Sequence, residues 1–72
     1  MSVFSDLLTR ARTAGARSLV FEVNLADYAA ARPDAWLCAR QDAGPDDPGN
    51  PAVRGQSGEE ALRRLVDALE SR

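Results

Sequence analysis

The spacing of apolar residues changes twice along this 72-residue chain, and this change restricts the fold more than any other feature. Apolar residues recur with helical spacing in residues 3–14, alternate with a period of two in residues 18–25, and return to helical spacing after residue 57. A chain of this length has room for one small domain. We therefore expect residues 1–72 to form a single α+β domain.

The first segment is predicted to be an amphipathic helix over residues 3–14. Ser2 is the expected N-cap, and Gly15 suits the left-handed position after the last turn. One stripe of this helix gathers apolar side chains that we expect to face the core: Val3, Phe4, Leu7, Leu8 and Ala11.

Residues 18–25 and 35–41 are predicted to be paired antiparallel strands, and residues 52–55 are a candidate third strand. On the first strand the inward set is Leu19, Phe21, Val23 and Leu25, and the outward set is Ser18, Val20, Glu22 and Asn24. On the second strand Trp36 and Cys38 share one face. With so few aromatic residues in the chain, Phe21 and Trp36 are the expected core anchors. Glu22 is predicted to pair with Arg40 across the strands.

Two segments do not show a regular period. Residues 26–34 contain good helix formers, and Asn24 with Asp27 resembles a cap pair, yet we favour a loop or extended connection there over a short helix. Residues 42–51 hold three Pro, two Gly and three Asp, which is typical of a flexible loop.

The C-terminal segment is predicted to be a second amphipathic helix. Ser57 and Glu60 have the spacing of a capping box, and Glu60 is four residues before Arg64, the favoured order for an ion pair. Its apolar stripe consists of Leu62, Leu65, Val66 and Leu69. Two terminal helices over one face of a small antiparallel sheet give an α+β two-layer sandwich in the order α-β-β-(β)-α.

Composition excludes several classes of function. The chain has no His and one Cys, so it has no disulfide framework, no tetrahedral zinc set and no His-based catalytic triad. A net charge of −2 does not suit a strongly basic nucleic-acid wrapper or a polybasic membrane binder. The N-terminus lacks the pattern of a signal peptide, and we expect a cytoplasmic protein.

Potential site residues fall into three groups. Arg10, Arg12 and Arg17 are expected to form a basic corner at the end of the first helix, either to contact a phosphate or acidic partner or to complement the helix dipole. Cys38 is expected to be a small buried hydrophobic residue, because no base is present to activate it. The acidic residues of the loop do not have EF-hand spacing, so we expect no metal site there: Asp42, Asp46 and Asp47. We also expect no cofactor and no catalytic residues.

The α-β-β-β-α order resembles that of double-stranded RNA-binding domains. In that family the last helix begins with a basic cluster, whereas Gly58, Glu59 and Glu60 stand at the corresponding place here. Separately, residues 53–62 are similar to the strand–turn–helix ending of HicB-type antitoxins. These resemblances imply a nucleic-acid-associated regulator that uses the basic corner.

The residues themselves favour a different function, a non-enzymatic protein-interaction module. A domain this small buries limited surface and gains stability from self-association. Edge-strand pairing is one route, and packing through an uncovered part of the first helix is another.

Overall fold

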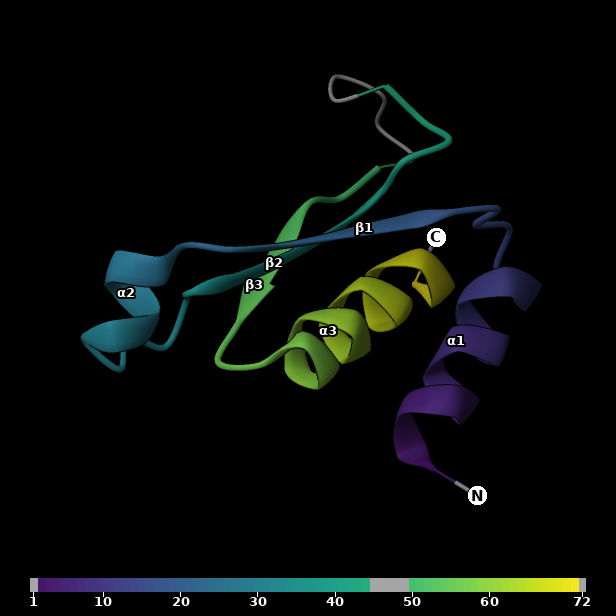
Figure 1. Ribbon diagram of the computed structural model, residues 1–72. Helices are drawn as coiled ribbons and strands as arrows, with labels where there is room; N and C mark the ends of the chain where they lie inside the picture. Colours follow the sequence, from purple (N-terminus) through teal and green to yellow (C-terminus); the bar gives the residue numbers. More distant parts are fainter. Residues whose placement is uncertain (1, 45–49, 72) are drawn as a thin grey trace.

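The computed structural model describes residues 2–44 and 50–71, which contain three helices and three strands. They follow one another as α1 (Val3–Thr13), β1 (Leu19–Val23), α2 (Leu25–Ala29), β2 (Trp36–Arg40), β3 (Val53–Gly55) and α3 (Gly58–Glu70). The strands form one sheet in the order β1-β2-β3, and α1 and α3 lie on the same side of it (Figure 1). The predicted α+β two-layer arrangement, including the third strand, is confirmed.

Both strand pairs are antiparallel, and their register brings the apolar positions together. Phe21 of β1 lies opposite Cys38 of β2, which in turn lies opposite Val53 of β3. Residues directly opposite in a sheet share a face. These three side chains therefore point to the side of the sheet that the helices cover.

Side-chain caps begin the two long helices. The Ser2 hydroxyl accepts a hydrogen bond from Ser5 N at 3.0 Å, and the Ser57 hydroxyl accepts one from Glu60 N at 3.1 Å. The Glu60 carboxylate binds Arg64 at 2.7 Å, and no return bond to the Ser57 amide is found in the described part of the chain. The Ser57 half of the predicted capping box therefore forms, and the Glu60 carboxylate pairs with Arg64 instead of with the Ser57 amide. 

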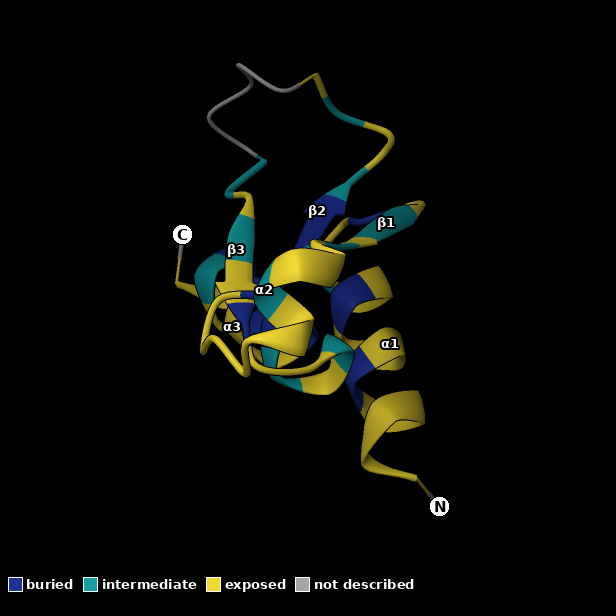
Figure 2. Ribbon diagram, turned by 60° about the vertical axis from the view of Figure 1, so that its left-hand side comes forward, coloured by how far each residue is buried: buried dark blue, intermediate teal, exposed yellow. Residues whose placement is uncertain are grey.

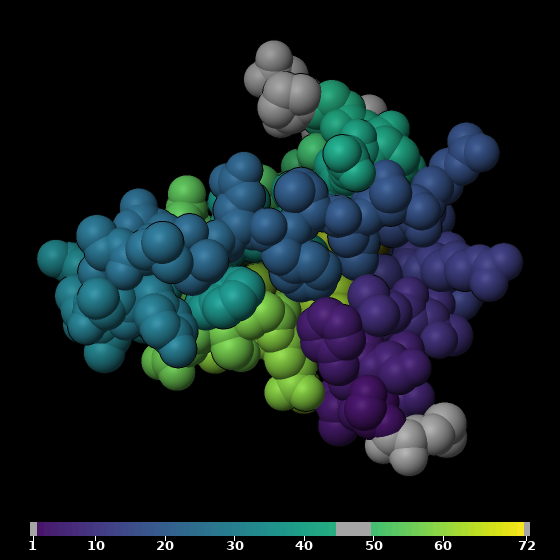
Figure 3. All heavy atoms as spheres, in the orientation of Figure 1, coloured from purple at the N-terminus to yellow at the C-terminus, as the bar shows by residue number. Residues whose placement is uncertain are grey.

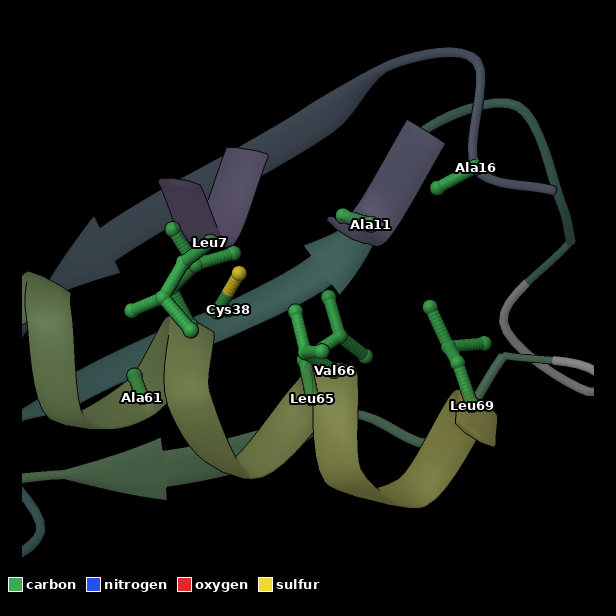
Figure 4. Packing of buried hydrophobic residues seen from close by; sticks show 9 residues of the cluster. Leu7, Ala11, Ala16, Cys38, Ala61, Leu65, Val66 and Leu69 are labelled. Atoms are coloured by element: carbon green, nitrogen blue, oxygen red, sulfur yellow. The ribbon is translucent and has the colours of Figure 1, made fainter. Parts of the chain in front are cut away.

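The centre of the core belongs to α3. Leu62, Leu65 and Val66 are fully buried, together with Cys38 of β2. Figure 4 shows Leu7 of α1 and Cys38 directed toward this helix from two sides. The α3 stripe faces both the sheet and α1, and it packs against β2, β3 and α1.

Phe21 and Trp36 are not the central anchors that the sequence predicted. Both are partly buried and pack at the margin of the cluster. Trp36 meets Tyr28 edge to face, with ring centroids 6.5 Å apart. The interior between two thin layers is filled by aliphatic side chains, which leaves the large rings at its edges.

The apolar stripe of α1 is buried only in part. Leu7 and Ala11 are buried, but Val3 is 51% exposed, Phe4 38% and Leu8 39% (Figure 2). The expectation that the whole stripe faces the core is therefore wrong. The physical reason is that α1 packs beside α3 and has little contact with the sheet.

Residues 25–29 form a short helix, α2, so the favoured prediction of a loop is wrong. The Asn24 side chain accepts a hydrogen bond from Asp27 N at 3.0 Å and caps the helix. The strand ends at Val23, and Leu25 is 72% exposed on the helix instead of pointing inward. A local cap has therefore overridden the continuation of the period-two pattern.

Asn50 fixes the end of the long connection between β2 and β3. Its side chain accepts a hydrogen bond from Arg40 N at 2.9 Å and donates one to Arg40 O at 3.1 Å. This amide therefore takes the place of a further strand residue beside β2. Residues 45–49 of the predicted 42–51 loop, including Asp46 and Asp47, lie outside the described residues.

Among the glycines in the described residues, Gly55 lies nearest to the backbone of another element. A Cβ there would lie 2.8 Å from Ala61 N of α3, whereas a Cβ at Gly44 would meet nothing within 4 Å. We expect Gly55→Ala to destabilise the protein by about 1–3 kcal/mol through overpacking. Urea unfolding followed by circular dichroism measures this, with Gly44→Ala as the matched control. Equal stability of the two variants would contradict the tight β3–α3 contact.

Candidate functional site

An open groove of about 790 Å³ lies between α1 and β1. The side chains that line it come from the two elements and from the connection between them. They are mainly apolar with two cations: Phe4, Leu8, Arg12, Arg17, Leu19 and Phe21. In Figure 3 the groove lies between the purple atoms of α1 and the blue atoms of β1.

The groove exists because no helix covers β1. Helix α3 packs on β2 and β3, and α1 packs on α3, but neither makes extensive contact with β1. Leu19 and Phe21 are consequently only partly buried. The Phe4 ring reaches across from α1 to Phe21, with centroids 5.9 Å apart and planes inclined by 36°.

The predicted basic corner is divided between two sides of α1. Arg12 and Arg17 line the groove, whereas Arg10 binds the Glu70 carboxylate through Nε at 3.2 Å and also through Nη2. Two residues along a helix differ by about 200° in direction, so Arg10 and Arg12 point to opposite sides. The expectation of one contiguous corner that includes Arg10 is therefore wrong.

Charge pairing distinguishes the arginines further. The Arg10 guanidinium lowers the pKa of Glu70 through a hydrogen bond and by its charge. Neither Arg12 nor Arg17 has a carboxylate within salt-bridge distance in the described ranges, 2–44 and 50–71. The groove therefore presents two exposed cations beside an apolar surface.

Strand β1 is an edge strand, and its hydrogen bonds show which backbone groups face outward. Asn24 N donates to Ala35 O, and Gln41 N donates to Ser18 O, so the even-numbered residues of β1 bond to β2. Hydrogen-bonded and non-bonded pairs alternate in an antiparallel ladder. The N–H and C=O groups of Leu19, Phe21 and Val23 therefore point to the free edge.

A partly covered ion pair, Arg40–Asp42, lies at the end of the sheet that is nearest the groove. Arg40 donates to Asp42 at 3.3 and 2.7 Å and to Gly15 O at 3.2 Å, with only 15% of the Arg40 side chain exposed. This guanidinium, helped by the Ser18 and Arg17 backbone N–H groups, holds the pKa of Asp42 well below its usual range against the opposing effect of desolvation.

The prediction that Glu22 pairs with Arg40 across the strands is wrong, because the register separates them. Glu22 lies opposite Leu37, and Arg40 lies opposite Leu19. Because side chains alternate along a strand, Arg40 shares the helix-covered face with Cys38 while Glu22 points to the other face. The two charged groups are therefore on opposite sides of the sheet.

Sequence reasoning did not locate the groove, although it named an uncovered part of the first helix as one route to self-association. A signal was nevertheless present, since the α1 stripe has three large residues beyond those that packing against α3 buries. Val3, Phe4 and Leu8 are these residues, and the last two line the groove.

No protein-family model matches the chain, and comparison with curated proteins and with solved structures finds no match. No helix within the described ranges has the length and apolar character needed to cross a membrane. The same residues contain no group of three or more acidic or thiol side chains placed to hold a metal ion.

The Arg40–Asp42 pair predicts a specific dependence of stability on pH. A carboxyl group whose pKa is lower in the folded state binds protons more readily when unfolded, so its contribution is present above pH ~4 and is lost as pH falls below that value. We expect Asp42→Asn to be less stable than the wild type at neutral pH and to lose less stability between neutral and acidic pH. Urea midpoints measured across that range test this. Arg40→Gln should flatten the profile similarly, and a profile identical to the wild type would contradict the pairing.

Cys38 is expected to be unreactive in the folded protein. Its side chain is fully buried, and desolvation raises the pKa of the thiol to about 11. We expect its reaction with a disulfide reagent at mildly alkaline pH to be at least about 100-fold slower than in denaturant, since only the thiolate attacks. Rapid labelling without denaturant would show that β2 is accessible.

Proposed function

We propose that this chain is a small, non-enzymatic protein-interaction module that self-associates through the groove and the free edge of β1. One observation carries the proposal. The apolar side of β1 lies along an open groove that neither terminal helix covers, and the adjoining strand edge has unpaired backbone groups in the described structure.

Two physical preferences favour a protein partner here. Free N–H and C=O groups at a sheet edge bind another extended strand readily. Exposed aromatic and aliphatic side chains next to them gain free energy when a partner removes them from water. Phe4, Leu8 and Phe21 line the groove beside the free edge of β1, so a partner strand at that edge would also cover these side chains.

The site also lacks what acid–base catalysis needs. Its charged groups are Arg12 and Arg17, and no carboxyl group lines the described groove. General acid–base work requires a group whose pKa is near the working pH, and an arginine does not meet this requirement. This composition supports binding over catalysis.

Sedimentation velocity over a concentration series tests the proposal. We expect a mass of two chains at concentrations of about 100 µM, a range in which weak dimers with micromolar dissociation constants are populated. Leu8→Glu places a charge in the groove and should shift the protein to monomer. Thr9→Glu, on an exposed position of the same helix outside the groove, should leave the dimer intact.

Two results would contradict the proposal. One is a monomer at every concentration. The other is binding to mixed-sequence nucleic acid at low salt that weakens steeply as salt is raised and is lost in an Arg12→Ala, Arg17→Ala variant. That second result would support the nucleic-acid-associated regulator instead.

A further inference from the structure

The free edge of β1 suits a two-fold arrangement centred on Phe21. In an antiparallel pair of two β1 strands, Phe21 lies opposite Phe21 of the second copy, and Leu19 lies opposite Val23 of the second copy. Leu19, Phe21 and Val23 are the three residues whose backbone groups face outward. This register therefore uses all of them in hydrogen-bonded pairs and is identical from both sides, as a two-fold interface requires.

The two ends of β1 have different neighbours. The groove lies at the start of the strand, where α1 connects to it, and α2 follows the end of the strand. Helix α1 lies on the same side of the sheet as α3, whereas α2 lies beyond the end of the sheet at which β1 ends (Figure 1). Figure 3 shows atoms of β1 uncovered along the face in view. Antiparallel pairing therefore brings α2 of each copy to the groove of the other.

The surfaces that meet in this way are complementary. Helix α2 has no buried residue and exposes Leu25 (72%) and Tyr28 (60%). It also carries Asp27, whose only ion pair in the described structure is a 3.7 Å contact with Arg32. The groove offers an apolar surface together with two cations that lack a carboxylate partner in the described ranges, Arg12 and Arg17.

We infer that the groove is filled by α2 of a second copy of this chain, with Leu25 and Tyr28 against its apolar wall and Asp27 near Arg17. The inference rests on the self-association proposed above and names the segment that completes it. A volume of about 790 Å³ lies in the range of pockets that hold small ligands, so a few side chains of α2 are enough to fill it. Each dimer contains this contact twice.

Cysteine cross-linking between two differently tagged chains tests the arrangement. In the Phe21-centred register, Asn24 of one copy lies opposite Ser18 of the other, so Leu25, the first residue of α2, and Arg17 follow as neighbours just beyond the paired strands. We expect cysteines at positions 17 and 25 to come within the distance that a disulfide bridges. A mixture of Arg17→Cys and Leu25→Cys chains should form a covalent heterodimer under mild oxidation. The native Cys38 is buried and stays outside the reaction. Arg63→Cys on the exposed side of α3, mixed with Leu25→Cys, is the control and should not cross-link.

A charge exchange gives a second, independent measurement. We expect Arg17→Glu and Asp27→Arg each to weaken the dimer several-fold by sedimentation, and the double variant to recover most of that loss. A monomeric wild type would overturn both the proposed function and this inference. A stable dimer that neither cross-links at 17 and 25 nor shows recovery in the double variant would overturn the inference alone.

Discussion

The packing of one helix stripe supports the rest of this fold. Leu62, Leu65 and Val66 of α3 are completely buried because the sheet lies on one side of them and α1 on the other. Both strands that α3 covers are short, and a sheet of this size needs such a helix for stability. The cap at Ser57 and the close contact at Gly55 set where this helix begins relative to β3.

This dependence on α3 also explains the uneven burial of the sheet. A helix about 10 Å wide covers roughly two strands, since neighbouring strands lie about 4.8 Å apart. Helix α3 lies over β2 and β3, so β1 remains outside its reach. Helix α1 stays beside α3, which buries Leu7 and Ala11 and leaves Phe4 and Leu8 at the rim of the groove. The surface that we propose as functional is therefore a consequence of having one core helix for three strands.

The elements that depend on local signals were predictable. The caps at Ser2 and Ser57 appear where the sequence placed them, because a cap depends on residues next to it in the chain. The candidate third strand forms as Val53–Gly55, where it pairs with β2. The structure of residues 24–29 was harder to predict, since the same segment fits both the end of a strand and a capped helix. The Asn24 cap decided it in favour of α2. The groove itself was not predicted. The predicted basic corner included Arg10, which binds Glu70 on another side of α1.

The sequence alone determined which residues share a face of each element, because helical and extended periods fix side-chain direction along the chain. It also determined the order of the two terminal helices and the strands between them, and the exclusion of His-based and disulfide chemistry. Only the tertiary structure decided how much of each apolar face is covered, which arginine pairs with Glu70, and on which side of the sheet Arg40 lies relative to Glu22. The physical reason is that coverage and pairing depend on what lies opposite a side chain. That neighbour comes from a segment up to 60 residues away, as Arg10 and Glu70 illustrate.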